Sequence, residues 1–381
     1  MPAIPPALQK TLSILLLIAI GILLKKKIKD KDQLGGIKAL ILSIALPATI
    51  FIALLKIKIE PELFMLPIMA LMFNLIMFGL AYLVLPKLGI EKLSADHKTL
   101  MMLFGSLAPG LSCFPFIKEY LGEETLAWAA LADVGNKVYG LILLYMVAMH
   151  WYLSIHKKDQ KVSSGEKVKS LLLSLVKEPI NMVLVAGLLF LSFGWTITSF
   201  PVFVQQSVQW MSNLMMPMIL LFIGLAVKVR KGDFNKIICM LFLKSGFAFL
   251  LSAAAISLIP GLSPLAILVL VCFPQSATSF WPFAHMAAVQ ELEGKNPEKP
   301  RTFNLELALT VLAFSLPFST ITIMSVCSAG ELFVSPMSSL VTGIILILLG
   351  SFSPAIKFFQ KKKETEEKVV PISAEVAPQA K

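Results

Sequence analysis

Two proline-containing stretches interrupt long apolar segments of this chain: GSLAPGLSCFP at 105–115 and FPQSATSFWP at 273–282. Proline lacks an amide donor, and its ring clashes with the preceding helical turn. Two prolines six or eight residues apart, with glycine, serine or threonine between them, therefore predict that a helix unwinds in the middle. One such stretch alone would indicate only a kinked helix. Two in matching positions predict paired interrupted helices, which in membrane transporters mark the binding site.

The composition predicts a membrane protein. Of the 381 residues, 57% are hydrophobic and 15% are charged, and the mean hydropathy is +0.81. Soluble domains carry about 25% charged residues, so this chain has too little polar surface to cover a soluble core. The excess apolar surface is expected to face lipid. The same composition excludes a disordered chain, a disulfide scaffold and a collagen-like fibre.

Apolar stretches of about 20 residues, the length that spans a bilayer, occur eleven times. They run at 8–24, 36–55, 65–86, 99–121, 126–153, 179–194, 213–229, 235–259, 264–290, 302–325 and 338–358. Lysines 25 to 27 follow the first stretch, where a secretory signal would carry a cleavage site. We therefore expect a retained first helix with its amino terminus outside.

The basic residues lie mainly on one side of this topology. Loops after the odd-numbered spans hold 28 of the 34 Lys and Arg residues, the opposite loops hold 4, and Lys137 and Lys244 lie within spans. The positive-inside rule assigns the crowded side to the cytoplasm. The net charge of +11 is thus explained by topology, and no nucleic-acid partner is expected. We expect an integral protein of the cell (inner) membrane with a cytoplasmic carboxyl terminus.

The spans form two matching units. Pro47 lies 68 residues before Pro115, and Pro217 lies 65 residues before Pro282. Five is an odd number of spans, so the two units must be inverted. The predicted fold is an all-α polytopic membrane protein of two inverted five-helix repeats plus one extra carboxyl-terminal transmembrane helix. The predicted parts are a first repeat at 8–153, a cytoplasmic linker with an interfacial helix at 154–178, a second repeat at 179–325, the extra helix at 331–360 and a disordered cytoplasmic tail at 361–381.

Several short motifs follow one another along the chain. They are Gly21 to Leu24 before the lysines, Leu46-Pro47-Ala48, Gly110 to Pro115, Leu131-Ala132-Asp133, Pro217 with Gly224-Leu225, and Pro274-Gln275 with Phe280 and Phe283-Ala284. Over about 8–325 this set resembles the auxin efflux carrier family of the bile-acid/arsenite/riboflavin transporter superfamily. Ala108, Pro109 and Cys113 depart from the family pattern, and the eleventh helix lies beyond the family core.

The resemblance implies that helices 4 and 9 cross at their interruptions. It also implies that helices 1, 2, 6 and 7 form a scaffold and that the others form a transport domain moving in an elevator cycle. Family substrates are small organic anions such as carboxylates, and the implied direction is efflux. A homodimer within the lipid bilayer is compatible with the resemblance.

The candidate substrate-binding residues lie at the two interruptions. Broken helix ends present backbone donors and a positive dipole, which suit a carboxylate. The candidates are Pro109, Gly110, Ser112, Pro115, Pro274, Gln275, Ser276, Thr278 and Ser279. Serine and threonine hydroxyls in membrane helices also bond their own backbone, which is the structural alternative for these residues.

Ionisable residues within the spans are candidates for ion or charge coupling. Asp133 and Lys137 lie four residues apart in the favourable acid-first order. They either neutralise each other, or Asp133 forms a proton or cation site beside Asn136. Lys244 either pairs with Glu306 or counters an anionic substrate.

These features predict a secondary transporter that exports small organic anions. The alternatives are a symporter of the same fold coupled to H+ or Na+, and a transporter-like sensor. The sequence contains no zinc-protease motif, serine elbow or phosphate-binding loop. We therefore expect no enzyme activity, no cofactor and no metal site.

Overall fold

A computed structural model describes residues 6–28, 30–56, 63, 65–155, 173, 177, 179–226, 234–294 and 301–351. Every regular element within these residues is helical. Six helices are long and apolar enough to cross a membrane: Asp32–Leu54, Met65–Leu88, Glu123–Ile155, Val202–Leu225, Ile237–Leu258 and Leu305–Val334. Four shorter apolar helices lie at Leu12–Leu24, Pro179–Ser192, Pro264–Gln275 and Pro336–Ser351. The predicted interfacial helix of 154–178 falls outside the described residues, apart from its first two positions and residues 173 and 177, and the tail at 361–381 lies wholly outside them.

The helices divide at the long linker into two sets. The first set is α1 (Pro6–Leu24), α2 (Lys31–Leu40), η1 (Ile41–Ala45), α3 (Leu46–Leu54), α4 (Met65–Val84), η3 (Leu85–Leu88), α5 (Ala95–Phe104), α6 (Pro109–Ser112), α7 (Phe114–Phe116), η4 (Ile117–Leu121), α8 (Glu123–Lys137), η5 (Val138–Leu143) and α9 (Leu144–Ile155). The second set is α11 (Pro179–Ser192), η6 (Ile197–Ser199), α12 (Val202–Asn213), α13 (Met215–Ala226), α14 (Phe234–Leu258), α15 (Pro264–Cys272), η7 (Phe273–Gln275), α16 (Trp281–Glu293), α17 (Leu305–Ala329) and η8 (Gly330–Val334), followed by the helix Pro336–Ser351.

The seventh span begins earlier than its hydropathy predicts. The sequence places its start at 213, whereas the structure continues the apolar helical segment back to Val202. Three glutamines within α12 lower the local hydropathy and hide this part of the span. Packing of α12 against α3 supplies the stabilisation that the apolar pattern lacks.

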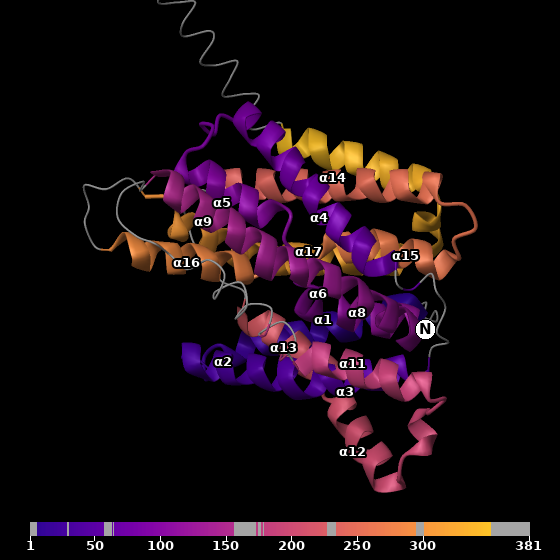
Figure 1. Ribbon diagram of the computed structural model, residues 1–381. Helices are drawn as coiled ribbons and strands as arrows, with labels where there is room; N and C mark the ends of the chain where they lie inside the picture. Colours follow the sequence, from indigo (N-terminus) through magenta and orange to yellow (C-terminus); the bar gives the residue numbers. More distant parts are fainter. Residues whose placement is uncertain are drawn as a thin grey trace, which may run out of the picture.

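The helices pack in two groups that share one seam (Figure 1). In the lower part of the view, α2, α3, α11, α12 and α13 lie together, and α1 packs along α13. In the upper part, α4, α5, α9 and α14 to α17 lie together. Helix α8 packs against α4 of the upper group and against α3 of the lower group, so α3 and α8 form the main seam.

Glycines allow the closest helix contact in the lower group. Gly21 of α1 packs against the backbone of Leu221 and Gly224 in α13, and Gly224 packs against the backbone of Ile18. A Cβ atom on either glycine would overlap the facing backbone. Small residues bring membrane helices into such backbone contact, where packing replaces the hydrophobic effect as the source of attraction.

The helix Pro336–Ser351 packs on α14 in the same way. A Cβ on Gly246 of α14 would lie 2.9 Å from the carbonyl oxygen of Gly343, and one on Gly350 would lie 2.8 Å from that of Cys239. This helix, which the resemblance leaves outside the family core, therefore supports the helix that carries Lys244.

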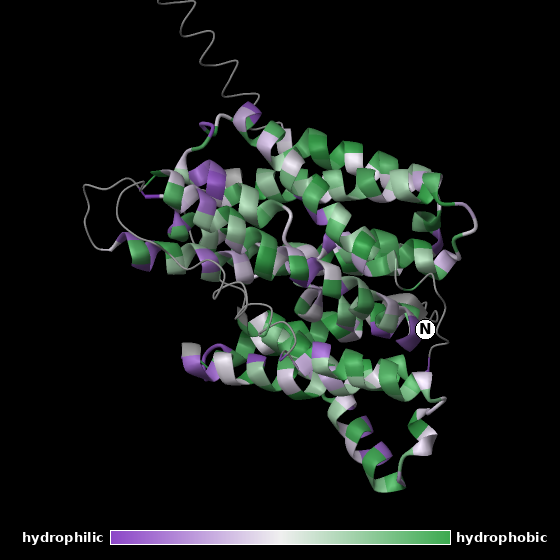
Figure 2. Cartoon of the chain, viewed as in Figure 1, coloured by the Kyte–Doolittle hydropathy of each residue, from purple (hydrophilic) through white to green (hydrophobic). Residues whose placement is uncertain are grey.

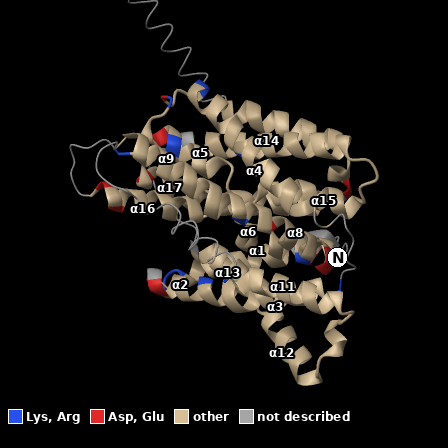
Figure 3. Cartoon of the chain, in the orientation of Figure 1, with Lys and Arg blue, Asp and Glu red and all other residues tan. Residues whose placement is uncertain are grey.

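The outer surface is apolar. Large side chains such as Leu16, Leu83 and Leu348 are exposed on α1, α4 and the last helix. Figure 2 shows that hydrophobic residues, coloured green, predominate along the helices. Figure 3 shows the charged residues gathered mainly at the two ends of the bundle. This arrangement is the one expected for helices that face lipid along their length and water at their ends.

Candidate functional site

The first interruption follows α5. Residues Gly105 to Ala108 are not helical, and α6 starts at Pro109. A second irregularity at Cys113 precedes α7, which carries Pro115 at its second position. Both prolines thus lie in the first turn of a short helix, where the amide hydrogen that proline lacks has no helical partner to lose. The unwinding predicted from these prolines is confirmed.

The second interruption follows α15. The 3₁₀ turn η7 contains Pro274, residues Ser276 to Ser279 are not helical, and α16 restarts with Pro282 at its second position. As in the first interruption, the helix that follows the unwound backbone carries a proline in its first turn; here a second proline, Pro274, also precedes the unwound backbone.

The two interruptions contact each other directly. The amide of Ala108 donates to the carbonyl oxygen of Ala277 over 2.7 Å. The amide of Ala277 donates to Ser112 Oγ over 2.9 Å, and the amide of Ser279 donates to Ser106 Oγ over 3.3 Å. Backbone groups freed by the unwinding of one helix are therefore satisfied by the other. We call this region the crossing, defined by residues 105–112 and 275–279.

Most hydroxyls at the crossing bond backbone groups. Ser112 Oγ also donates to the carbonyl of Ala108 over 2.8 Å, and Ser276 Oγ donates to that of Phe273 over 2.6 Å. Ser279 Oγ accepts from the amide of Trp281 over 3.3 Å. In this conformation these three candidates hold the interruptions in shape, as the structural alternative expects.

Gly110 contacts the lower group of helices, and Pro109, Pro115 and Pro274 are buried. A Cβ on Gly110 would lie 3.1 Å from Leu46 Cδ2 and 3.6 Å from Leu42 Cδ2. Gly110 therefore lies under side chains of η1 and α3, which belong to the lower group of helices. The crossing and the seam between the two groups are in contact at this point.

Lys244 of α14 joins the two interruptions. Its ammonium donates to the carbonyl oxygen of Ser106 over 2.9 Å and to Thr278 Oγ1 over 3.2 Å. The side chain is buried. Among the described residues the structure shows no ion pair between Lys244 and Glu306, which is exposed at the start of α17. The alternative that pairs the two residues is not the geometry of this conformation, because Lys244 reaches the crossing and Glu306 faces outward at a helix end.

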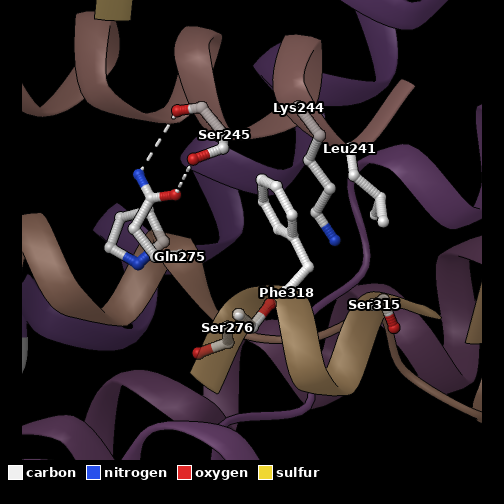
Figure 4. A pocket seen from close by; sticks show the side chains of 9 residues that line it. Leu241, Lys244, Ser245, Gln275, Ser276, Ser315 and Phe318 are labelled. Atoms are coloured by element: carbon white, nitrogen blue, oxygen red, sulfur yellow. Dashed lines mark hydrogen bonds between the residues drawn. The ribbon is translucent and has the colours of Figure 1, made fainter. Parts of the chain in front are cut away.

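Gln275 is fixed by the residue after Lys244. Ser245 Oγ donates to Gln275 Oε1 over 2.6 Å, and Gln275 Nε2 donates to the carbonyl of Ser245 over 3.3 Å (Figure 4). This two-bond contact sets the direction of the amide and connects α14 to the second interruption.

A small cavity lies beside this pair (Figure 4). Its volume is about 10 Å³, which is room for one water molecule. Most of its wall is apolar, and its lining residues are Leu241, Lys244, Ser245, Pro274, Gln275, Ser276, Ser315, Phe318 and Ser319. The crossing is therefore closely packed in this conformation, and residues of α14, η7 and α17 enclose only a water-sized space.

Asn136 of α8 supports the first interruption. Its Nδ2 donates to the carbonyl of Leu107 over 2.9 Å, and its Oδ1 accepts from the amide of Leu107 over 3.3 Å. The same side chain donates to Asp133 Oδ1 over 2.8 Å and accepts from Asn74 Nδ2 over 3.2 Å. The amide thus pairs with unwound backbone as a neighbouring strand would.

Asp133 and Lys137 form a buried ion pair. Lys137 Nζ lies 3.3 Å from Asp133 Oδ2 and donates to Asn181 Oδ1 over 3.2 Å. Asn181 lies on α11, across the seam from α8. The first of the two predicted alternatives, mutual neutralisation, is the geometry that the structure shows.

A second lysine contact crosses the seam. Lys118 of η4 donates to Ser212 Oγ over 2.9 Å, and Ser212 Oγ lies 2.9 Å from Thr49 Oγ1 of α3. On α2, Lys38 Nζ lies 5.1 Å from the centre of the Phe280 ring, within the range of a cation–π contact.

Three further serines, Ser106, Ser245 and Ser315, belong to the site although no sequence motif marks them. Ser106 bonds Lys244 and Ser279 at the crossing. Ser245 and Ser315 line the cavity, and the amide of Thr278 donates to Ser315 Oγ over 3.2 Å. The sequence feature that could have indicated these serines is their position as polar residues within apolar spans. Ser245 also directly follows Lys244.

Comparison with known proteins supports a transport role. No protein-family model matches the chain. An uncharacterized transporter of Methanocaldococcus jannaschii is 27% identical over 231 residues, which cover 59% of this chain and 70% of that protein. The chain is a transporter-like helical membrane protein. The relative is itself uncharacterized, so the comparison indicates no substrate for this transporter-like chain.

Proposed function

We propose that the chain is a secondary transporter that moves small organic anions such as carboxylates out of the cell. The observation that carries the proposal is the crossing: two interrupted helices meet backbone to backbone, and a lysine ammonium lies between them. Unwound backbone at the membrane midplane is the usual setting for a transported solute.

The charge at the crossing favours an anion. Asp133 and Lys137 neutralise each other, whereas Lys244 has no carboxylate partner among the described residues. The amino-terminal end of α16 adds a partial positive charge beside the second interruption. In a low-dielectric interior this net positive charge attracts a carboxylate more strongly than it would in water.

The packing supports an elevator movement. Two groups of helices meet at the α3–α8 seam, and the crossing belongs to the upper group. The contacts of Lys118 with Ser212 and of Lys137 with Asn181 are hydrogen bonds between the groups. Sliding of one group along the other would exchange these bonds without unfolding either group. In this proposal each group takes helices from both inverted five-helix repeats, and the amino terminus lies outside.

A symporter coupled to Na+ or H+ is the second candidate. It is favoured by the unwound carbonyl of Ser106, since such carbonyls coordinate coupling ions in other transporters. Flux of labelled carboxylates into proteoliposomes under imposed Na+, H+ or substrate gradients separates the two candidates. Saturable binding without flux would favour a sensor over both.

Gln275→Ala tests the site. Loss of the hydrogen-bonded amide beside the crossing should lower carboxylate flux about tenfold, because one such bond corresponds to about 1.4 kcal/mol. Gln290→Ala is the matched control, since Gln290 lies on the exposed side of α16. Equal flux for wild type and Gln275→Ala at equal expression would remove Gln275 from the site.

A further inference from the structure

The partners of Lys244 are those of a bound metal cation. One is the carbonyl oxygen of Ser106, which lies just beyond the carboxyl end of α5, and the other is Thr278 Oγ1. The carboxyl end of a helix carries a partial negative charge. Neutral oxygens near such an end attract a cation, and here the lysine ammonium supplies it.

The contacts of Lys244 lie between the two interruptions, where a transporter with broken helices would hold a coupling cation. In transporters with broken helices, unwound carbonyls and half-helix ends coordinate the coupling cation. Ser106 belongs to the first interruption and Thr278 to the second, so Lys244 Nζ links both with one positive charge. The ammonium comes from α14, a third helix, and is covalently attached to the protein.

We propose that Lys244 is a tethered cation, which occupies the place of a free monovalent cation between the two interruptions. Its ammonium keeps the crossing assembled and positively charged without Na+ or K+. The assignment stands on the geometry of the crossing, and its consequence for transport rests on the proposed function: transport by the natural protein needs no monovalent metal cation.

Truncation of this side chain should open a cation site. Lys244→Ala removes the stem and the ammonium, and the space that they leave joins the water-sized cavity that Lys244 already lines. The oxygens of Ser106 and Thr278 remain and lose their donor. A Na+ or K+ ion with one or two waters would restore both the charge and the contacts, as hard cations prefer oxygen ligands.

The experiment measures the melting temperature of the purified full-length protein in detergent. Wild type and Lys244→Ala are compared in NaCl, KCl and choline chloride at one ionic strength. Wild type should melt at the same temperature in all three salts. Lys244→Ala should melt about 2–4 °C higher in NaCl or KCl than in choline chloride, because an ion that binds the native state stabilises it.

Two further variants sharpen the result. Lys118→Ala is the matched control, because Lys118 donates to a serine hydroxyl away from the crossing, and its melting temperature should not depend on the cation. Lys244→Met removes the charge but fills the space with an apolar chain. It should therefore melt lower than wild type in every salt and show no response to Na+ or K+.

The outcomes decide the proposal. Folding of Lys244→Ala only in the presence of Na+ or K+ would support it as strongly as a shifted melting temperature. Equal melting of Lys244→Ala in all three salts, or failure to fold in any of them, would overturn it, because the vacated place would then accept no free cation. Absence of carboxylate flux would refute the proposed function and leave this melting result unaffected.

Discussion

Replacing Asn136 by leucine should destabilise the protein more than any other Asn→Leu change in the same network. Leucine is close in shape to asparagine but makes no hydrogen bonds. The change removes four bonds, to the carbonyl and the amide of Leu107, to Asp133 and to Asn74. The two bonds to Leu107 matter most, because unwound backbone has no neighbouring turn to pair with.

The magnitude follows from the number and type of bonds. Hydrogen bonds between membrane helices average about 0.6 kcal/mol, so four give roughly 2.4 kcal/mol. A buried backbone group left without a partner costs about 1–3 kcal/mol, so the two groups of Leu107 alone give roughly 2–6 kcal/mol. Asp133 keeps Lys137 as a partner, so the bond lost to Asp133 adds little to the loss of unfolding free energy. We expect Asn136→Leu to lower the free energy of unfolding by about 2–4 kcal/mol.

The assay is equilibrium unfolding of purified protein in mixed detergent micelles with increasing dodecyl sulfate, followed by far-ultraviolet circular dichroism. Asn74→Leu is the control. It removes one bond to Asn136 and also removes Asn74 Oδ1, a buried acceptor that has no partner among the described residues. Its cost should stay below about 1 kcal/mol. Equal costs for the two variants would refute the idea that Asn136 supports the interruption.

Two further changes test the ion pair and the glycine contact. Asp133→Asn leaves Lys137 buried without its carboxylate and should lower the unfolding free energy by about 3–5 kcal/mol; adding Lys137→Met should recover most of this loss, and an additive double variant would contradict the pairing. Gly224→Val should cost about 1–3 kcal/mol by forcing α1 from α13, whereas Gly79→Val on an open face of α4 should cost less, since only the first valine meets a facing backbone; similar unfolding curves for the two variants would argue against the close contact.

The interruptions were predicted from the sequence because their cause is local. A proline removes a hydrogen bond from its own helix wherever that helix lies, so Pro109 and Pro274 indicate unwound backbone without any knowledge of neighbours. The ion pair of Asp133 with Lys137 has the same local character, because four residues is one helical turn. Hydropathy indicated the six long apolar helices for a similar reason, although glutamines in α12 concealed the start of one of them at Val202.

The contacts between polar residues far apart in the sequence could not be predicted from local patterns. Lys244 is 138 residues from Ser106 in the chain, and the sequence offered Glu306 as an equally reasonable partner. Asn136 was expected beside an ion site, whereas it supports Leu107. Which polar groups meet depends on how helices pack, and packing depends on contacts such as those of Gly246 and Gly343 that no local pattern encodes.

The sequence by itself determined that this chain is a bundle of apolar helices with two of them interrupted, because hydropathy and proline act within single helices. Only the tertiary structure decided that the interruptions bond to each other and that Lys244, rather than an ion pair at the surface, lies between them. The physical reason is that buried polar groups must find partners through space. The crossing forms where the unwound backbone of one helix meets that of another.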